Sequence, residues 1–138
     1  MGVDHLTNLR QFVARGPGAT LELGKIAEYL VCADLILGGH HAYPSDQGLP
    51  YDVVVDVGRR LLKVQVKATC FAKNVNATGR RPRVAYMWHI RKRGVKGHGA
   101  RLDASHCDIL AMVALDIRAI AYLPQALCGQ CMQLSPPG

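Results

Sequence analysis

The chain has 138 residues, which suits one domain of ordinary size with a buried core, so we expect a single domain over 1–138. Hydrophobic residues make up 49% and charged residues 20%, a composition that excludes disordered and collagen-like proteins. The formal net charge of +7 favours a polyanionic partner. The apolar runs fall far short of the roughly 20 residues of a membrane helix, and the N-terminal residues lack a signal-peptide core. We therefore expect neither a membrane span nor secretion.

The five cysteines are an odd number without a disulfide framework, which indicates a reduced, intracellular protein in the cytoplasm. Cys128 and Cys131 have the spacing of zinc ligands, but a lone pair without a second pair of Cys or His is a weak signal. We therefore discount a zinc site.

In chain order, 1–18 is expected to be a short helix or an arm that ends at the break Gly16-Pro-Gly18. Apolar residues at alternating steps of three and four then predict an amphipathic helix over 20–37. Thr20 is expected to cap its start, and Gly38-Gly39 to end it.

The rest of the chain has the patterns of strands. After a polar loop over 40–49, β-branched residues predict a strand over 50–57, and strict alternation predicts another over 61–69, so the two form a hairpin. Further strands are predicted over 84–90, 107–115 and 117–123, separated by basic loops over 70–82 and 91–101 and followed by a tail over 125–138. Tyr86 and Trp88 share one face of their strand and are expected to pack in the core. The order of elements predicts an α/β (α+β) fold, with the sheet covered by at least the first long helix.

The positive charge is concentrated in the middle of the chain. Of the 17 lysines and arginines, 13 lie between residues 59 and 101, a stretch without Asp or Glu. A solvated face normally mixes the two signs, so this block favours nucleic acid as the partner, although a merely solubilising face is the alternative. The residues expected to contact phosphates are Arg80, Arg81, Arg83, Arg91, Lys92, Arg93 and Lys96.

Polar residues within the predicted hairpin point to chemistry. Period two places Gln65 and Lys67 on one face of their strand, and the hairpin can bring Asp52 beside them. A carboxylate, an amide oxygen and a main-chain carbonyl are oxygen ligands that suit Mg²⁺. A nearby ammonium can orient a water or neutralise developing negative charge, so these are the parts of metal-assisted phosphodiester hydrolysis.

These residues resemble the PD-(D/E)XK nuclease superfamily, and within it the branch in which Gln replaces the second acid, similar to the homing endonuclease of cyanobacterial group I introns. The matching pieces are Gly24-Lys-Ile-Ala-Glu28, Pro50-Tyr-Asp52 and Gln65-Val-Lys67. A weaker fourth piece runs from Asp108 to Pro124. The resemblance covers most of the chain, and it departs from the pattern where Tyr51 separates Pro50 from Asp52 and where Gln65 removes one negative charge.

The resemblance implies a restriction-endonuclease-like core, a central mixed sheet flanked by helices, and a metal-dependent endonuclease that hydrolyses DNA with Mg²⁺ or Mn²⁺. By position, Asp52 is the main metal ligand, Gln65 contributes its side-chain oxygen and Val66 its carbonyl. Glu28 holds a metal-bound water or a second ion, and Lys67 sits by the attacking water. A chain this small cannot easily enclose a duplex, so we expect a homodimer or a higher homo-oligomer.

Alternatives exist for both the residues and the function. Glu22 and Asp56 are rivals for Glu28 and Asp52, but Glu22 suits the first turn of a helix and Asp56 lies nearer the basic turn. Because Gln65 weakens the metal site, the alternative function is a catalytically weak or inactive nuclease-fold module that binds nucleic acid or a partner protein.

Overall fold

The computed structural model describes residues 4–75, 81–92, 100–101 and 106–137, and at 91–92 and 100–101 it describes the strand pairing alone. The helical segments are α1 (His5–Ala14), the 3-10 helix η1 (Gly16–Ala19), α2 (Thr20–Leu37) and the 3-10 helix η2 (Gln125–Leu127). The strands are β1 (His41–Pro44), β2 (Val53–Asp56), β3 (Leu61–Thr69), β4 (Lys73–Val75), β5 (Arg83–His89), β6 (Arg91–Lys92), β7 (Ala100–Arg101), β8 (Ile109–Ala114), β9 (Ala119–Pro124) and β10 (Cys131–Leu134).

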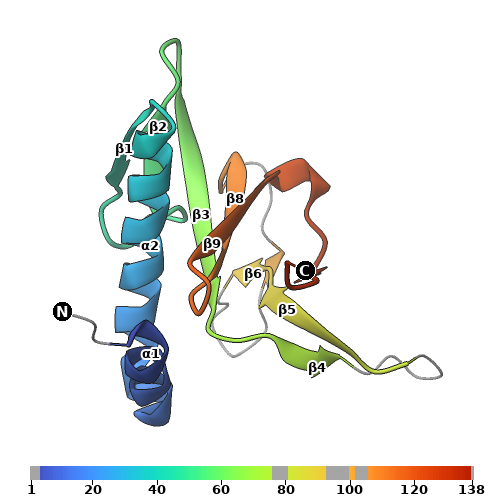
Figure 1. Ribbon diagram of the computed structural model, residues 1–138. Helices are drawn as coiled ribbons and strands as arrows, with labels where there is room; N and C mark the ends of the chain where they lie inside the picture. Colours follow the sequence, from blue (N-terminus) through green and yellow to red (C-terminus); the bar gives the residue numbers. More distant parts are fainter. Residues whose placement is uncertain (1–3, 76–80, 93–99, 102–105, 138) are drawn as a thin grey trace.

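A five-stranded mixed sheet with the order β1-β2-β3-β8-β9 forms the centre of the fold. β3 and β8 run parallel, and the other neighbours in this sheet run antiparallel. The long helix α2 lies along the β1-β2-β3 side of this sheet (Figure 1). The predicted fold class, a mixed sheet with helices against it, is therefore confirmed.

The predicted helix over 20–37 is confirmed, but its predicted cap is wrong. η1 runs directly into α2, so Thr20 is already helical and its backbone N–H donates to Pro17 O, while its side chain makes no cap. The helix ends at Leu37 as predicted, and Gly39 follows with a φ of +91°, a conformation that favours glycine. The side chains that α2 buries are Ala27, Val31 and Cys32.

The predicted hairpin of β2 and β3 is confirmed, with Val53 opposite Val64 and Asp56 opposite Leu61. Its turn is closed by the N–H of Gly58, which donates to the Asp56 carboxylate at 2.8 Å. β3 is longer than β2 and continues beyond the first residue of its partner. This overhang leaves one side of β3 open next to Asp52, where the candidate site forms.

β8 is shared by two hydrophobic cores because its side chains alternate between the two faces of the sheet. Val113 packs in the first core, under α2, and Leu110 packs in the second. The second core also holds Tyr86 and Trp88, so their predicted role in packing is confirmed. Trp88 donates its indole N–H to Val113 O at 3.1 Å. The other side of β8 is thus covered by the small sheet β10-β5-β4, in place of a helix.

Several short strands occur where loops or a tail were predicted. The predicted loops over 40–49, 70–82 and 91–101 contain β1, β4 and the β6–β7 pair, and the predicted tail contains β10, which pairs with β5. These strands have two to four residues each, which is too short for an alternating pattern to stand out in the sequence. β1 also ends at Pro44, a residue tolerated on an edge strand.

α1 is tied to the rest of the fold. Leu9 is buried in the first core, and the ring N–H of His5 donates to Leu115 O at 2.7 Å. Among the described residues, no helix combines the length and the hydropathy needed to cross a membrane.

Candidate active site

Asp52 lies immediately before β2, and three main-chain and side-chain groups fix it there. Its own N–H donates to Val64 O at 2.9 Å, which continues the pairing with β3. Its carboxylate oxygen Oδ2 accepts two hydrogen bonds from the overhang of β3, one from the Val66 N–H at 2.8 Å and one from the Gln65 amide nitrogen at 2.6 Å. The structure therefore brings Asp52, Gln65 and Val66 into direct contact.

The environment of Asp52 disfavours the charged form of its carboxyl group. Burial is the largest influence and raises the pKa of Asp52 above its ordinary value, and the nearby Glu28 carboxylate also raises it. The hydrogen bond from Val66 lowers this pKa, and Lys67 and Lys25 lower it less. Because the net shift is upward, a cation bound beside Asp52 would relieve an existing cost of ionisation.

Glu28 reaches the same place from α2. Its side chain is 18% exposed, and its Oε2 lies 2.9 Å from the ammonium of Lys25, which precedes it by one helical turn. Glu28 raises the pKa of Lys25 through this hydrogen bond and through its charge. Two acids on different elements, Glu28 and Asp52, thus face one space.

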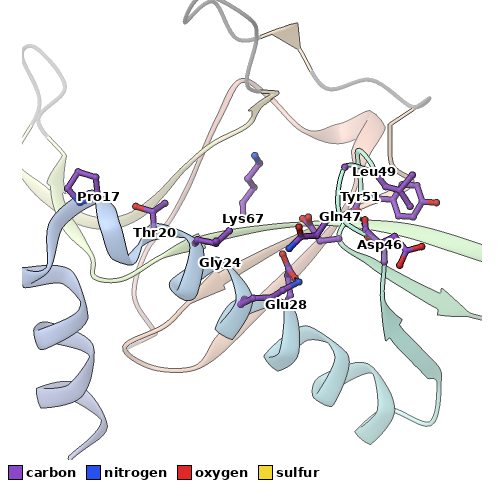
Figure 2. A pocket seen from close by; sticks show the side chains of 14 residues that line it. Pro17, Thr20, Gly24, Glu28, Asp46, Gln47, Leu49, Tyr51 and Lys67 are labelled. Carbon is purple, nitrogen blue, oxygen red and sulfur yellow. Dashed lines mark hydrogen bonds and ion pairs between the residues drawn. The ribbon is translucent and has the colours of Figure 1, made fainter.

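That space is a pocket of about 790 Å³ between the first half of α2 and the segment 45–52. Figure 2 shows Glu28 entering it from the helix and Lys67 from the sheet, with the Lys67 ammonium directed away from Glu28. The predicted catalytic residues Glu28, Asp52 and Lys67 all line the pocket. Its other polar lining residues include Thr20, Lys25, Ser45, Asp46, Gln47 and Tyr51.

The outer wall of the pocket is a loop that is closed at its base. The N–H of Ser45 donates to Asp52 O at 2.9 Å, and the Ser45 hydroxyl donates to Tyr51 O at 2.5 Å. Gly48 at the tip has a φ of +91°, which favours glycine. Sequence reasoning assigned no role to this wall or to Lys25, although the turn-forming Gly48 and the spacing of Lys25 to Glu28 were visible signals.

The side chains fit a hard divalent cation held by few protein ligands. Glu28 and Asp52 offer carboxylate oxygens, and the Val66 C=O points to the same side of β3 as the N–H that contacts Asp52. Among the described residues, no three His, Cys, Asp or Glu side chains are grouped closely enough to hold a metal ion by themselves. Mg²⁺ is commonly held by one or two carboxylates and keeps several waters.

Gln65 presents its amide nitrogen to Asp52, so its amide oxygen points away from that carboxylate. For Gln65 to offer oxygen to a cation beside Asp52, its amide must turn over. Asp52 would then lose the hydrogen bond from the Gln65 amide nitrogen and contact the cation in its place.

The rival acids lie outside the pocket. Glu22 pairs with Arg15 at 3.4 Å on the surface of the helix start, and Asp56 accepts the turn hydrogen bond from Gly58. Each therefore has a local structural role.

The predicted phosphate contacts lie only partly within the described residues. Arg81 and Arg83 are exposed at the start of β5, where Arg83 donates to the Gln133 side-chain oxygen at 2.6 Å. For Arg91 and Lys92 the structure describes the β6 pairing alone. The remaining predicted contacts lie outside the described residues: Arg80, Arg93 and Lys96.

The five-stranded mixed sheet with α2 along it forms an α/β fold (Figure 1). The fold matches the solved structure of a bacterial homing endonuclease, I-Ssp6803I, with a TM-score of 0.65 over 86% of this chain and 79% of that chain. The two sequences are 19% identical over the match, so the likeness is one of fold. No protein-family model matches the chain, and no curated protein sequence matches it.

Proposed function

We propose that this protein is a metal-dependent endonuclease that hydrolyses DNA phosphodiester bonds, in the Gln-containing branch of the PD-(D/E)XK superfamily. The observation that carries the proposal is the pocket lined by Asp52, immediately before β2, by Glu28 from α2 and by Lys67 from β3. A fold shared with a homing endonuclease adds support.

In this proposal Asp52 and Glu28 hold Mg²⁺, or Mn²⁺ in its place, with the Val66 carbonyl and, after its amide turns, Gln65. When bound, the cation supplies Lewis-acid activation of water and neutralises charge on the phosphate. The Val66 N–H donates a hydrogen bond of 2.8 Å to Asp52 Oδ2 and so keeps the carboxylate oriented. Lys67 provides a positive charge in the pocket, where it orients the attacking water and stabilises the negative charge that develops on the phosphoryl oxygens.

DNA is the proposed partner because of the basic block over 59–101, of which Arg81 and Arg83 are exposed on the surface. A chain this small cannot easily enclose a duplex, and a homodimer or a higher homo-oligomer would place one such site on each strand. In the described part of the chain β9 is an edge strand of the central sheet, which makes it a candidate surface for such an interface. We place the protein in the reducing cytoplasm on the ground of its cysteine pattern.

The test incubates supercoiled plasmid with the purified protein in Mg²⁺, Mn²⁺ or EDTA, beside Asp52→Ala and Lys67→Ala. Gel shift in EDTA measures binding separately from cleavage. We expect metal-dependent nicking or linearisation that both variants lose, while both still bind DNA in a salt-sensitive manner.

The neutral side chain of Gln65 favours a second candidate, a nucleic-acid-binding module with weak or no catalysis, because an amide binds a cation less strongly than a carboxylate. This module would bind DNA in gel shift but cleave neither plasmid, branched nor single-stranded substrates in any metal. That outcome would contradict the nuclease proposal and establish the module.

A further inference from the structure

Lys25 is a charged residue that lines the pocket, and the proposed reaction assigns no role to it. It precedes Glu28 by one turn of α2, and the 2.9 Å contact between Nζ and Oε2 joins the two side chains at the rim of the pocket. The Lys25 side chain is 38% exposed and the Glu28 side chain 18%, so the pair lies partly out of water. Screening by solvent is therefore weaker for this pair than for an open surface pair.

The pair balances the charge of the two acids. Glu28 raises the pKa of Asp52, and Lys25 lowers it. Lys25 and Glu28 therefore act on Asp52, the main proposed metal ligand, as well as on one another. Without Lys25, the pocket would still hold the carboxylates of Glu28 and Asp52 but would lose one of the positive charges that compensate them.

We propose that Lys25 is a displaceable counter-ion, which neutralises Glu28 in the metal-free protein and gives up this carboxylate when a divalent cation binds. The inference rests on the proposed function, because it takes Glu28 and Asp52 as the acids that hold the cation. A cation that approaches Glu28 meets an ammonium already within hydrogen-bond distance, so part of its binding free energy is spent on breaking that contact. Lys25 is a positioning residue in this account, since it acts through Glu28.

Displacement of Lys25 from Glu28 would also affect the binding of the substrate. The ammonium released from Glu28 stays in the lining of the pocket, because its backbone is fixed in α2. A phosphodiester entering the pocket then meets a positive charge that was masked before the cation bound. Binding of the cation and of DNA phosphate at this site should therefore reinforce each other.

The test measures Mg²⁺ and Mn²⁺ affinity by titration calorimetry without DNA, so the result does not depend on activity. Lys25→Met keeps a helix-forming, flexible side chain but removes the charge, and it should bind each cation roughly three- to tenfold more tightly than wild type. Lys25→Arg preserves the pair and should bind no more tightly than wild type. Added salt should reduce the gain of Lys25→Met.

Lys73→Met is the matched control. Lys73 is exposed on β4 and does not line the pocket, so this variant loses the same charge without touching Glu28. Its metal affinity should stay near wild type. Thermal melting of all variants without metal checks that they are equally folded.

Asp52→Asn distinguishes a failure of the counter-ion proposal from a failure of the proposed metal site. If wild type binds cations in a manner that needs Asp52, and Lys25→Met binds no more tightly, the counter-ion proposal is wrong and the metal site stands. The same holds if Lys73→Met gains as much as Lys25→Met. If neither wild type nor Lys25→Met binds a cation, the metal site itself is wrong, and the counter-ion proposal falls with it.

Discussion

Asp52 is held in an environment that disfavours its charge. Burial raises its pKa, while the hydrogen bonds from Val66 and Gln65 keep the carboxylate in place. A carboxyl with a raised pKa in the folded protein lowers stability as the pH rises from the ordinary value through the raised pKa, because the unfolded chain ionises more easily. Residues selected for a site often carry such a cost.

Asp52→Asn should therefore stabilise the metal-free protein at neutral pH, by roughly 0.5–1 kcal/mol. The Asn oxygen can accept the hydrogen bonds that Asp52 receives from Val66 and Gln65, but it carries no charge. The gain should shrink as the pH falls through the raised pKa, and it should vanish below the ordinary value of an aspartic acid, where both proteins are neutral at this position. Urea unfolding over a pH series checks this, and a gain that grows toward acid pH would contradict it.

Part of the candidate site could be predicted because it depends on local pairing. Period two placed Gln65 and Lys67 on one face of their strand, and the hairpin register brought Asp52 against that strand. The direction of the Gln65 amide could not be predicted, since it depends on the hydrogen bond to Asp52 at 2.6 Å. The part played by Lys25 was missed because spacing alone does not distinguish a pair in a pocket from one on a solvated face.

At the scale of elements, α2 both covers the sheet and forms one wall of the pocket. Gly24 lies in the interior of this helix and lines the pocket, and a Cβ added there would meet no atom within 4 Å. Glycine in a helix interior is unfavourable by about 1 kcal/mol relative to alanine. The helix and its packing therefore give no reason for a glycine at this position.

Gly24→Ala should raise the free energy of unfolding by roughly 0.5–1 kcal/mol, because the added methyl group improves the helix without a clash. Gly24→Leu should also fold, but its larger side chain extends into the pocket one turn before Glu28 and should weaken cleavage. Thermal melting and plasmid nicking measured on both variants distinguish the two effects. Equal nicking by Gly24→Leu and wild type would show that the substrate does not use this wall.

The elements that could be predicted are those long enough to show a period. The 18 residues of α2 and the 9 of β3 repeat their patterns several times. The strands that were missed are short, and one of them, β10, also gains its partner from distant residues, since Cys131 pairs with His89 in β5. The Thr20 cap was predicted wrongly because the preceding 3-10 helix already supplies an acceptor at Pro17.

At the scale of the whole molecule, β8 joins the two cores. Leu110 packs in the core shared with the small sheet, and its neighbours in β8 pack under α2. Trp88, the single tryptophan, is 3% exposed in the same core as Leu110 and bonds to the backbone of β8. Its fluorescence therefore reports whether the small sheet is docked on the central one.

Leu110→Ala should lower the free energy of unfolding by about 2–4 kcal/mol, through lost burial and the cavity left behind. Because β8 belongs to both cores, Trp88 fluorescence and far-ultraviolet circular dichroism should report one common transition in wild type and in the variant. If fluorescence changed at a lower denaturant concentration than circular dichroism, the small sheet would be an independent unit.

The central claim is that Asp52 holds the cation that drives DNA cleavage, and one comparison tests it most directly. Supercoiled plasmid is incubated in Mg²⁺ with wild type, Asp52→Asn and Asp56→Asn, and the rate of nicking is measured for each. Asp56 is the last residue of β2 and lies outside the pocket, whereas Asp52 immediately precedes β2, so the two variants make the same chemical change in different surroundings. We expect Asp56→Asn to nick at the wild-type rate and Asp52→Asn, although well folded, to lose at least about a hundredfold. Equal rates for Asp52→Asn and wild type would contradict the claim.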